Sequence, residues 1–241
     1  MFFADIHNHI LFGVDDGAKS VDEMFQLIDS SYNDGVKVLC CTPHYHPVFF
    51  DSQSEQILKV FNLARRYVRE HYSDLRLFLG SELRYEYSCT EWVDNGRCHT
   101  LNGTNNLLVD FAYSEKAQTI IDAMLHVLNG GFTPILAHAE RYEHLHKDFR
   151  EIKQLKSWGV IIQVDAQSPL GDFGLGVKKR SHRLLDHGLV DVIASDAHNL
   201  ITRAPQLKLC SSYISRKYGK DYAHYLFWDK PLQILNIDYK L

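Results

Sequence analysis

No stretch of this 241-residue sequence is long and apolar enough to form a membrane-spanning helix, which needs roughly 18 consecutive apolar residues. Residues 1–5 have neither a basic start nor a long apolar core, so we expect no signal peptide and no direct insertion into a membrane. An excess of positive charge is also missing, since the formal net charge is -4. Without a basic stripe, the chain is not expected to bind nucleic acid.

Cysteine is sparse and shows no pattern. The five cysteines are odd in number and contain no C-x-x-C, which favours reduced thiols in a cytoplasmic protein over a disulfide framework. The sequence has no G-x-G-x-x-G after its first apolar segment and no Walker loop, which argues against dinucleotide and P-loop sites. Because no repeat, low-complexity segment or Pro/Gly/Ser linker interrupts the chain, we predict a single domain over residues 1–241.

Apolar and amphipathic segments alternate along the chain. Seven short apolar runs, several nearly continuous in Val, Ile and Leu, are typical of parallel strands buried on both faces. We predict strands over residues 2–7, 36–41, 75–79, 106–109, 134–137, 160–164 and 190–194. We predict helices over residues 21–33, 54–71, 116–128, 149–157 and 178–186. This βα rhythm favours an α/β fold, a barrel or distorted barrel of the TIM type, over an open sheet.

Histidine, in contrast to cysteine, is abundant, with 14 residues. His7 and His9 are two positions apart on a predicted strand, so their side chains point to the same side and can chelate one ion. Asp196 and His198 repeat this spacing after the last predicted strand. The strand ends in between are followed by His44, Glu82, Asp110 and His138. Because the C-terminal strand ends of a parallel barrel meet on one face, we expect these side chains to converge into one metal site.

A mixture of imidazole and carboxylate without thiolate suits Mn, Fe, Zn or Mg rather than a structural zinc clip. Ions about 3.5–4 Å apart can hold both ends of an in-line phosphoryl displacement, which favours a phosphatase. Arg141, shortly after His138, and Arg203, after the D-x-H pair, carry the planar guanidinium group that suits a phosphate oxygen. Taken alone, each strand-end ligand is better explained as a hydrogen-bonded core residue or a solvated loop residue, and each arginine equally well as a surface ion pair. The prediction rests on their joint placement.

A second phosphatase chemistry has to be weighed as well. Cys210 and Arg216 form C-x-x-x-x-x-R, the spacing of cysteine-dependent tyrosine phosphatases. That chemistry needs a glycine-rich loop around a thiol of low pKa. The intervening residues contain no glycine and lie in a predicted helix, which argues against a catalytic cysteine.

Four motifs then follow one another in a recognisable order. They are H-N-H-I-L-F-G-V-D-D-G-A at residues 7–18, T-P-H at 42–44, H-A-E-R-Y at 138–142 and S-D-A-H-N at 195–199. Together they resemble the bacterial manganese-dependent protein-tyrosine phosphatases of the CpsB/CapC type, within the polymerase and histidinol phosphatase (PHP) superfamily. The resemblance covers nearly the whole chain.

The resemblance implies a distorted (β/α)7 TIM-like barrel, the PHP fold, with a metal site at the C-terminal strand ends. It implies three Mn2+ ions, with Fe, Co, Zn or Mg as substitutes. The implied ligands are His7, His9, Glu82 and Asp196 for one ion, Glu82 (bridging), Asp110 and His138 for a second, and Asp16, His44 and His198 for a third. Arg141 and Arg203 match the phosphate-binding arginines of the family. The chain departs from the family at Asp110, where Glu is usual, and the shorter side chain bears on occupancy or metal preference at the second ion.

The implied substrate is the phosphotyrosine tail of a membrane-associated bacterial tyrosine autokinase that controls capsule or exopolysaccharide assembly. Two alternatives stay open, because the ligand residues do not distinguish them. One is a small-molecule phosphatase of the same superfamily, acting for example on histidinol phosphate. The other is a metal-binding regulatory subunit with degenerate catalysis. The native metal, the general acid and the oligomeric state are also left open by the sequence. Candidates for stacking on a substrate ring near the rim are Tyr45, Phe49, Tyr85, Tyr113 and Tyr142.

Overall fold

The strands of the fold pair with their neighbours in parallel. The computed structural model describes residues 1–50 and 54–239. Its strands are β1 (Phe3–Asp5), β2 (Val36–Cys41), β3 (His44–Tyr45), β4 (Arg76–Leu79), β5 (Glu82–Arg84), β6 (Asn106–Asp110), β7 (Thr133–Leu136), β8 (Ile161–Asp165) and β9 (Val192–Ala194). They form one sheet of order β1-β2-β4 and a second of order β3-β5-β6-β7-β8-β9. The predicted α/β fold with a parallel sheet is thereby confirmed.

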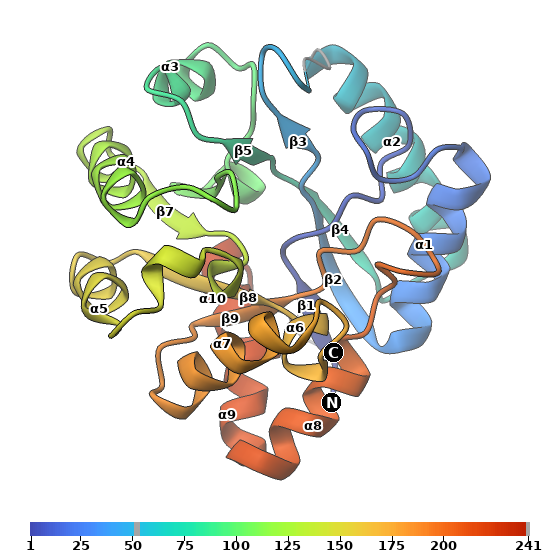
Figure 1. Ribbon diagram of the computed structural model, residues 1–241. Coiled ribbons are helices and arrows are strands. Elements are labelled where there is room, and N and C mark those ends of the chain that lie inside the picture. Colours follow the sequence, from blue (N-terminus) through green and yellow to red (C-terminus); the bar gives the residue numbers. More distant parts are fainter. Residues whose placement is uncertain (51–53, 240–241) are drawn as a thin grey trace.

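Helices surround these strands (Figure 1). They are α1 (Val21–Asp34), α2 (Ser54–His71), α3 (Cys89–Asp94), α4 (Ala117–Asn129), α5 (Arg150–Ser157), α6 (Gln167–Leu170), α7 (Leu175–Asp186), α8 (Leu207–Tyr218), α9 (Lys220–His224) and α10 (Lys230–Leu235). Short 3-10 turns are η1 (Leu101–Gly103), η2 (Ala139–Arg141) and η3 (Glu143–Leu145), and a π-helical turn is η4 (Tyr225–Asp229). In Figure 1, α1 and α2 lie on one side of the strands, and α4 and α5 lie on the opposite side. Among the described residues, none of these helices combines the length and the apolar character that crossing a membrane requires.

The first helix shows how local sequence sets the boundaries of an element. The Ser20 side chain accepts a hydrogen bond from the backbone N–H of Glu23, which caps the start of α1. At its other end Gly35 adopts φ 105°, a left-handed conformation that glycine tolerates without strain. The predicted helix over residues 21–33 is therefore confirmed to within one residue.

Most of the strands are buried on both faces, as their continuous apolar sequences predict, whereas β4 is partly exposed. On β2, Leu39 and Cys41 belong to the larger apolar core beneath the surrounding helices, whereas Val38 and Cys40 belong to a smaller inner core. The inner core also includes Ile234 and Leu235 of α10. Figure 1 shows α10 behind the centre of the strands. The helix thus packs against the inner face of the strands.

Two of the predicted strands, β2 and β4, are each followed after a short break by a second strand. Residues 36–45 form β2 and β3 with a break at Thr42 and Pro43, and residues 76–84 form β4 and β5 with a break at Gly80 and Ser81. Proline cannot donate a hydrogen bond to a neighbouring strand, which explains the first break. The breaks still face each other, because Gly80 N donates to Cys41 O at 2.8 Å and Glu82 N donates to Pro43 O at 3.0 Å. The described strands are therefore more numerous than the seven that we predict from sequence.

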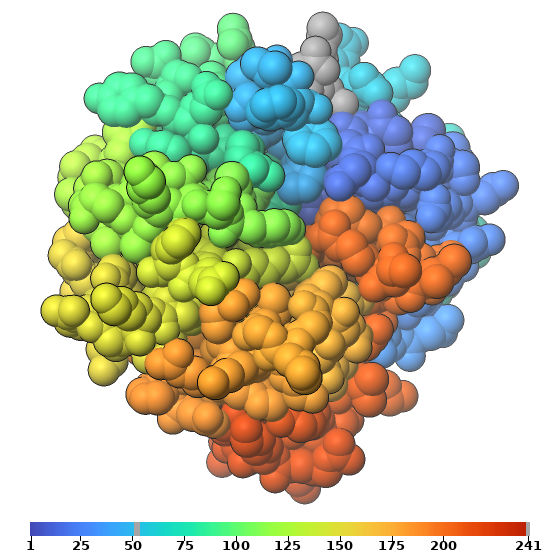
Figure 2. All heavy atoms as spheres, viewed as in Figure 1, coloured from blue at the N-terminus to red at the C-terminus, as the bar shows by residue number. Residues whose placement is uncertain are grey.

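The two ends of this strand array meet. Asn8, just after β1, forms an isolated parallel bridge with Ala197, just after β9. His9 N donates to Ala197 O and Asp196 N donates to His7 O, each at 2.8 Å. In Figure 2 the first part of the chain (dark blue) and the segment near residue 200 (orange) adjoin at the surface. The sheets are thus curled into at least a half-barrel, and residues nearly 190 positions apart lie side by side.

Candidate metal centre

The nine predicted ligands lie at or just beyond strand ends and face one another. They follow β1 (His7, His9, Asp16), open β3 and β5 (His44, Glu82), close β6 (Asp110), and follow β7 and β9 (His138, Asp196, His198). Most of them are buried, with Asp16 the most exposed at a side-chain fraction of 51%. Each is joined to at least one other member by the contacts described below.

The tightest group contains His7, His9, Glu82 and Asp196. The Nε2 atoms of the two histidines are 3.2 Å apart, and each lies 3.1 Å from Glu82 Oε2. Asp196 Oδ1 lies 3.4 Å from both nitrogens. Ligand bonds of about 2.0–2.1 Å place neighbouring ligand atoms about 3.0–3.4 Å apart around one ion. The four side chains therefore have the spacing of atoms that share a metal ion.

The orientation of these atoms supports the same interpretation. Glu82 Oε2 and Asp196 Oδ1 are fully buried and have no partner in hydrogen-bond geometry, although histidine nitrogens lie within 3.4 Å. An unsatisfied buried carboxylate oxygen is costly, so such oxygens are rare in folded proteins. The lone pairs of these oxygens point toward the neighbouring ligand atoms without forming hydrogen bonds. That arrangement suits a cation that binds all of these atoms.

Glu82 also joins a second group through its other oxygen. Its Oε1 lies 3.0 Å from His138 Nε2, and that nitrogen lies 3.6 Å from Asp110 Oδ1. His44, Glu82 and Asp110 likewise offer ligand atoms within 4.8 Å of one another. Because Glu82 uses one oxygen for each group, it is placed to bridge two ions. Asp110, despite its short side chain, lies within this second group.

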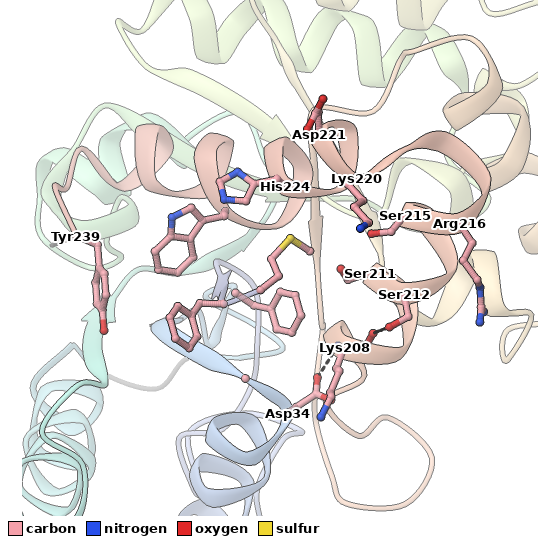
Figure 3. A pocket seen from close by; sticks show the side chains of 15 residues that line it. Asp34, Lys208, Ser211, Ser212, Ser215, Arg216, Lys220, Asp221, His224 and Tyr239 are labelled. Atoms are coloured by element: carbon pink, nitrogen blue, oxygen red, sulfur yellow. Dashed lines mark hydrogen bonds between the residues drawn. The ribbon is translucent and has the colours of Figure 1, made fainter. Parts of the chain in front are cut away.

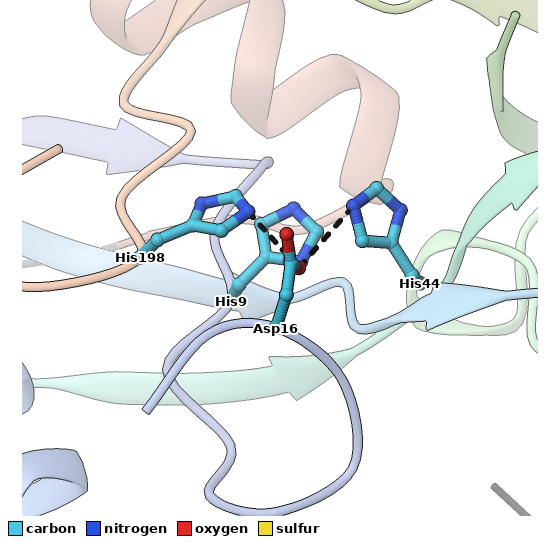
Figure 4. A group of neighbouring side chains, drawn as sticks. All are labelled: His9, Asp16, His44 and His198. Atoms are coloured by element: carbon cyan, nitrogen blue, oxygen red, sulfur yellow. Dashed lines mark ion pairs between the residues drawn. The ribbon is translucent and has the colours of Figure 1, made fainter. Parts of the chain in front are cut away.

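A third group is centred on Asp16. Its Oδ1 lies 3.4 Å from His198 Nε2 and 3.6 Å from His44 Nε2. Figure 4 shows the rings of His198 and His44 on either side of Asp16, with the ring of His9 between them. His9 therefore approaches two groups, which goes beyond the resemblance-based assignment. His44 also has two neighbours, because its Nδ1 lies 2.9 Å from Glu82 Oε2.

Two side chains that the sequence analysis did not identify orient the first pair of histidines. Gln163 Oε1 lies 3.0 Å from His7 Nδ1, and Asp15 Oδ2 lies 2.7 Å from His9 Nδ1. An acceptor at Nδ1 keeps the proton there and leaves the Nε2 lone pair for a cation. Asp15 stands next to Asp16 in the motif of residues 7–18, so the sequence indicated that it lies near the site. Nothing in the sequence indicated this for Gln163.

Tyr142 orients the second group. Its hydroxyl donates to Asp110 Oδ1 at 3.1 Å and lies 3.2 Å from His138 Nδ1. The ring is fully buried, so Tyr142 is a structural support and does not stack on a substrate. Among the other aromatic candidates, Phe49 and Tyr113 have exposed fractions of 73% and 56%.

Both predicted arginines reach the outer oxygen of Asp196. Arg141 Nη2 lies 3.0 Å from Asp196 Oδ2, and Arg203 Nη2 forms an ion pair with the same oxygen. Arg141 is further held by Asp165 at 2.5 Å and donates to the Tyr113 hydroxyl at 2.8 Å. Two guanidinium groups therefore border the groups of predicted metal ligands, as a phosphate-binding site requires.

A third arginine was not identified from the sequence. Arg84 Nε lies 2.7 Å from Asp110 Oδ2, on the side of the second group. The pattern E-L-R in β5 places Glu82 and Arg84 on the same face of the strand, which was a usable signal.

The charges of the site stabilise one another. Burial alone would lower the pKa of His7, but the carboxylates of Glu82 and Asp196 outweigh it and raise the pKa of His7 to about 9. Burial would raise the pKa of Asp196, yet His7, His9 and the two arginines hold it well below its usual range. Glu82 and Asp196 therefore keep their negative charge deep in the protein, which favours cation binding, whereas burial and the neighbouring Glu82 raise the pKa of Asp110.

The backbone at two of the ligand positions is strained. His138 has φ 34° and Asp196 has φ 50°, in the left-handed region that residues other than glycine rarely adopt. Such conformations cost of order 1 kcal/mol or more and cluster at functional sites, where the surrounding structure enforces them. Both residues turn sharply out of strand ends, which aims their side chains at the common centre.

The cysteine alternative does not fit the structure. Cys210 lies within α8, is fully buried, and burial strongly raises the pKa of its thiol. Arg216 instead lines a separate cleft of about 1,060 Å³, shown in Figure 3, together with Lys208 and three serines of α8. This cleft contains none of the predicted site residues. A buried, protonated thiol on a regular helix cannot act as the phosphatase nucleophile.

Known proteins resemble this chain over nearly its whole length. The family model for capsular polysaccharide synthesis, CpsB/CapC, matches residues 3–236. Tyrosine-protein phosphatase CpsB of Streptococcus agalactiae serotype III is 33% identical over 240 residues, which cover 98% of this chain and 99% of the relative. Tyrosine-protein phosphatase CpsB of Streptococcus pneumoniae is 33% identical over 236 residues, which cover 96% and 97%.

A solved structure has the same fold. It comes from crystal structures of YwqE from Bacillus subtilis and CpsB from Streptococcus pneumoniae, described as unique metal-dependent tyrosine phosphatases. Its TM-score is 0.87 at 23% sequence identity, and the match covers 98% of this chain and 96% of the solved chain.

Proposed function

The chain belongs to the CpsB/CapC family, and from that membership we propose that it is a metal-dependent protein-tyrosine phosphatase. Its substrate is the phosphotyrosine tail of a membrane-associated bacterial tyrosine autokinase that regulates capsule or exopolysaccharide synthesis. The enzyme works in the cytoplasm, in keeping with five cysteines that are all free. A single domain spanning residues 1–241 carries the activity.

The observation that carries this proposal is the convergence of the nine predicted ligands with Arg141 and Arg203. These residues come from positions between 7 and 203, and they lie in contact with one another. In a metal-dependent phosphatase, cations and guanidinium groups act on the same phosphoryl group. An interaction module would have no need for so many buried charges, which are costly to desolvate.

We assign the side chains to three ions. His7, His9, Glu82 and Asp196 hold the first ion. The second is held by Glu82, Asp110 and His138. Asp16, His44 and His198 hold the third. The buried Glu82 and Asp196 oxygens that lack hydrogen bonds support this assignment, as does a donor set of imidazoles and carboxylates that suits Mn2+.

The finer architecture that we infer is a seven-membered ring of strands. In it, β2 with β3 and β4 with β5 each count as one interrupted strand, and the bridge between Asn8 and Ala197 closes the ring. The metal centre then lies at the C-terminal strand ends, the usual position of active sites in TIM-type barrels.

In this mechanism the protein side chains orient the phosphoryl group and stabilise its charge. Bound ions supply Lewis acidity and a lowered pKa for the attacking water. The guanidinium groups of Arg141 and Arg203 bind phosphoryl oxygens and stabilise the negative charge that develops in the transition state. Asp165 and Tyr113 hold Arg141 in position. The tyrosine leaves as a phenolate with a pKa near 10, so protonation assists its departure but is not obligatory.

The deciding experiment compares chelator-stripped protein with the same protein after Mn2+ addition. The substrates are a phosphotyrosine peptide, histidinol phosphate and a sugar phosphate. We expect hydrolysis of the peptide only in the presence of metal. Peptide hydrolysis that is indifferent to chelator would refute the metal mechanism. Faster turnover of histidinol phosphate would favour the small-molecule alternative, and inactivity on every substrate would favour a regulatory subunit.

A further inference from the structure

A smaller cleft lies directly beside the metal centre. It has a volume of about 390 Å³, within the range of about 300–1,000 Å³ that is usual for ligand pockets. We call it the aromatic cleft, because Phe49, Tyr85, Tyr87 and Phe111 line it together with His46 and Arg84. None of the predicted metal ligands lines it.

The aromatic cleft is continuous with the second ligand group. Arg84, in its floor, is paired with Asp110 at 2.7 Å and lies next to it in the register of β5 and β6. Phe111 directly follows Asp110 in the chain. The cleft therefore begins one residue beyond the ligands, on the two strands that carry Glu82 and Asp110.

Its walls are aromatic rings held in place from behind. The ring of His46 stacks on Phe49 at 4.6 Å and is fixed by Glu86 at 2.9 Å. On the other side Tyr85 stacks on Phe111 at 5.5 Å. Tyr87 stacks on His126 at 4.5 Å.

Two of these rings are unusually exposed. Phe49 has an exposed fraction of 73% and Tyr87 one of 80%. Large apolar groups that gather around an open cleft mark interaction sites. Because Arg84 of the same cleft is paired with Asp110, a group bound by these rings lies near the second ligand group.

The charges around the cleft are already engaged within the protein. Arg84 is paired with Asp110, and Glu86 is paired with His46. Glu115 accepts a hydrogen bond from Lys116 N through Oε1. The rings are therefore the main free binding surface, and aromatic pairs are stabilised by stacking beyond the area that they bury.

We propose that the aromatic cleft is a specificity subsite for an aromatic side chain that flanks the phosphotyrosine of a peptide substrate. This inference rests on the proposed phosphatase function. In an extended peptide, side chains two positions apart point to the same side and lie about 7 Å apart. Glu82 and Arg84 have this relation on β5, so a residue two positions from the phosphotyrosine is the best match for the cleft.

The test uses phosphotyrosine peptides that differ at one flanking position. In each peptide one residue is varied, one or two positions before or after the phosphotyrosine. The varied residue is tyrosine, alanine or lysine. With Mn2+-loaded enzyme we expect kcat/KM for the tyrosine-flanked peptide to exceed that of its alanine counterpart by about three- to tenfold, as aromatic pairs contribute. Free phosphotyrosine has no flanking residue, so its turnover reports on the metal centre alone.

Variants in the cleft then assign the preference to it. In Tyr87→Ala and Phe49→Ala the ratio of the two kcat/KM values is expected to fall toward one. Both side chains are exposed, so neither change removes core packing. Leu209→Ala on α8, with an exposed fraction of 56%, is the matched control and is expected to keep the ratio.

A binding measurement makes the result independent of turnover. Non-hydrolysable phosphonate peptides are expected to show the same tyrosine preference in Kd by calorimetry.

Three results would each overturn the subsite: equal kcat/KM or Kd values for the tyrosine and alanine peptides, a preference for lysine, or a tyrosine-to-alanine ratio that is unchanged in both cleft variants. If neither free phosphotyrosine nor any of the peptides is hydrolysed by the Mn2+-loaded protein, the proposed function fails. If all peptides are hydrolysed equally, the function stands and only the subsite falls.

Discussion

Arg141 and Arg203 reach the same carboxylate oxygen of Asp196, but they differ in burial. The side chain of Arg141 is 9% exposed and also neutralises the buried Asp165. Burial already raises the pKa of Asp165 to about 7, so removing Arg141 would change the protonation of the interior as well as phosphate binding. The side chain of Arg203 is 25% exposed. Arg203 is therefore the better position for testing phosphate binding separately from folding.

For Arg203→Ala we expect kcat on a phosphotyrosine peptide to fall by about 10²–10³, the usual effect of losing one donor to a developing negative charge. Steady-state kinetics at saturating Mn2+ measures this effect, and thermal unfolding checks that the variant remains folded. Arg203→Lys retains the charge but not the two-pronged geometry, and we expect only partial recovery. An unchanged kcat would place Arg203 outside the phosphoryl site.

Asp15 supports a second prediction at this scale, because it touches His9 and not the substrate. Its carboxylate lies 2.7 Å from His9 Nδ1 and also accepts from the backbone N–H groups of Gly17 and His44. Loss of such an orienting partner usually weakens metal affinity by about 10–100-fold. We expect this loss in Asp15→Ala, measured by Mn2+ titration and by elemental analysis after dialysis.

Asp22→Ala is the control for Asp15→Ala. Asp22 is an exposed acid in the first turn of α1. The control is expected to bind Mn2+ as the parent protein does. Equal Mn2+ affinity in the two variants would mean that His9 needs no support from Asp15.

The sequence predicted the residues that follow apolar strands, such as His138 and Asp196, because strand ends can be read from local patterns. It did not predict Gln163, whose side chain reaches His7 across 156 positions in the chain. It also left the role of Tyr142 open. A buried glutamine or tyrosine has no local pattern that separates support of a ligand from ordinary packing.

Among the elements, the loop between β1 and α1 depends on one glycine. A Cβ atom added to Gly17 would lie 1.9 Å from the carbonyl oxygen of His9. That contact is with backbone, so the loop that carries Asp15 and Asp16 would have to move. For Gly17→Ala we expect loss of Mn2+ binding by the Asp16 group and a sharp fall in activity, measured by Mn2+ stoichiometry and by peptide hydrolysis.

Gly13 offers a control in the same loop. It has φ 66°, and no heavy atom lies within 4 Å of an added Cβ. Gly13→Ala is therefore strained by roughly 1 kcal/mol without a clash. We expect it to lower the free energy of unfolding slightly while retaining the Mn2+ stoichiometry. Similar Mn2+ loss in both variants would show that any strain in the loop, and not the contact at Gly17, disrupts the site.

The helices were the easier elements to predict. The residues of α2 agree with the prediction in full, and those of α4 to within one position, because each has a continuous amphipathic pattern. The strands β3 and β5 were missed as separate elements, since two or three residues after a break carry no period of their own. β5 pairs with β6, and β3 pairs in turn with β5, so both strands depend on partners that only the assembled sheet provides.

At the scale of the whole molecule, the buried carboxylates couple metal binding to stability. Glu82, Asp110 and Asp196 are each at most 2% exposed and lie close together. A ligand that binds only the folded state adds about 2.7 kcal/mol at 100 times its Kd. For a domain of this size that corresponds to about 5–10 °C in Tm. Calorimetry with Mn2+ and with chelator should show this difference, and Glu82→Gln should abolish most of it. A Tm that is insensitive to Mn2+ would argue against the assigned ligands.

Acid stability depends on a group remote from the metal ligands. His146 is buried, its Nε2 lies 2.8 Å from Ala139 O, and its Nδ1 has no partner. Burial, with a smaller contribution from Arg180 and Arg183, lowers the pKa of His146 from 6.5 to about 4. The neutral ring therefore stabilises the fold fully above pH 6.5, and this stability is lost as the pH falls toward 4, because the unfolded chain takes up the proton first.

The loss from His146 amounts to about 2 kcal/mol in the free energy of unfolding between pH 7 and pH 5. His146→Gln keeps an N–H donor for Ala139 O but cannot titrate, so its stability should fall less over the same interval. Denaturant unfolding of both proteins at each pH, with chelator present throughout, isolates this difference from the metal ligands, which are common to both. Parallel pH profiles would mean that His146 takes up its proton as readily in the folded protein as in the unfolded chain. A profile that is flatter in the variant by about 2 kcal/mol would assign a large part of the acid sensitivity of the whole molecule to one ring between η2 and α7.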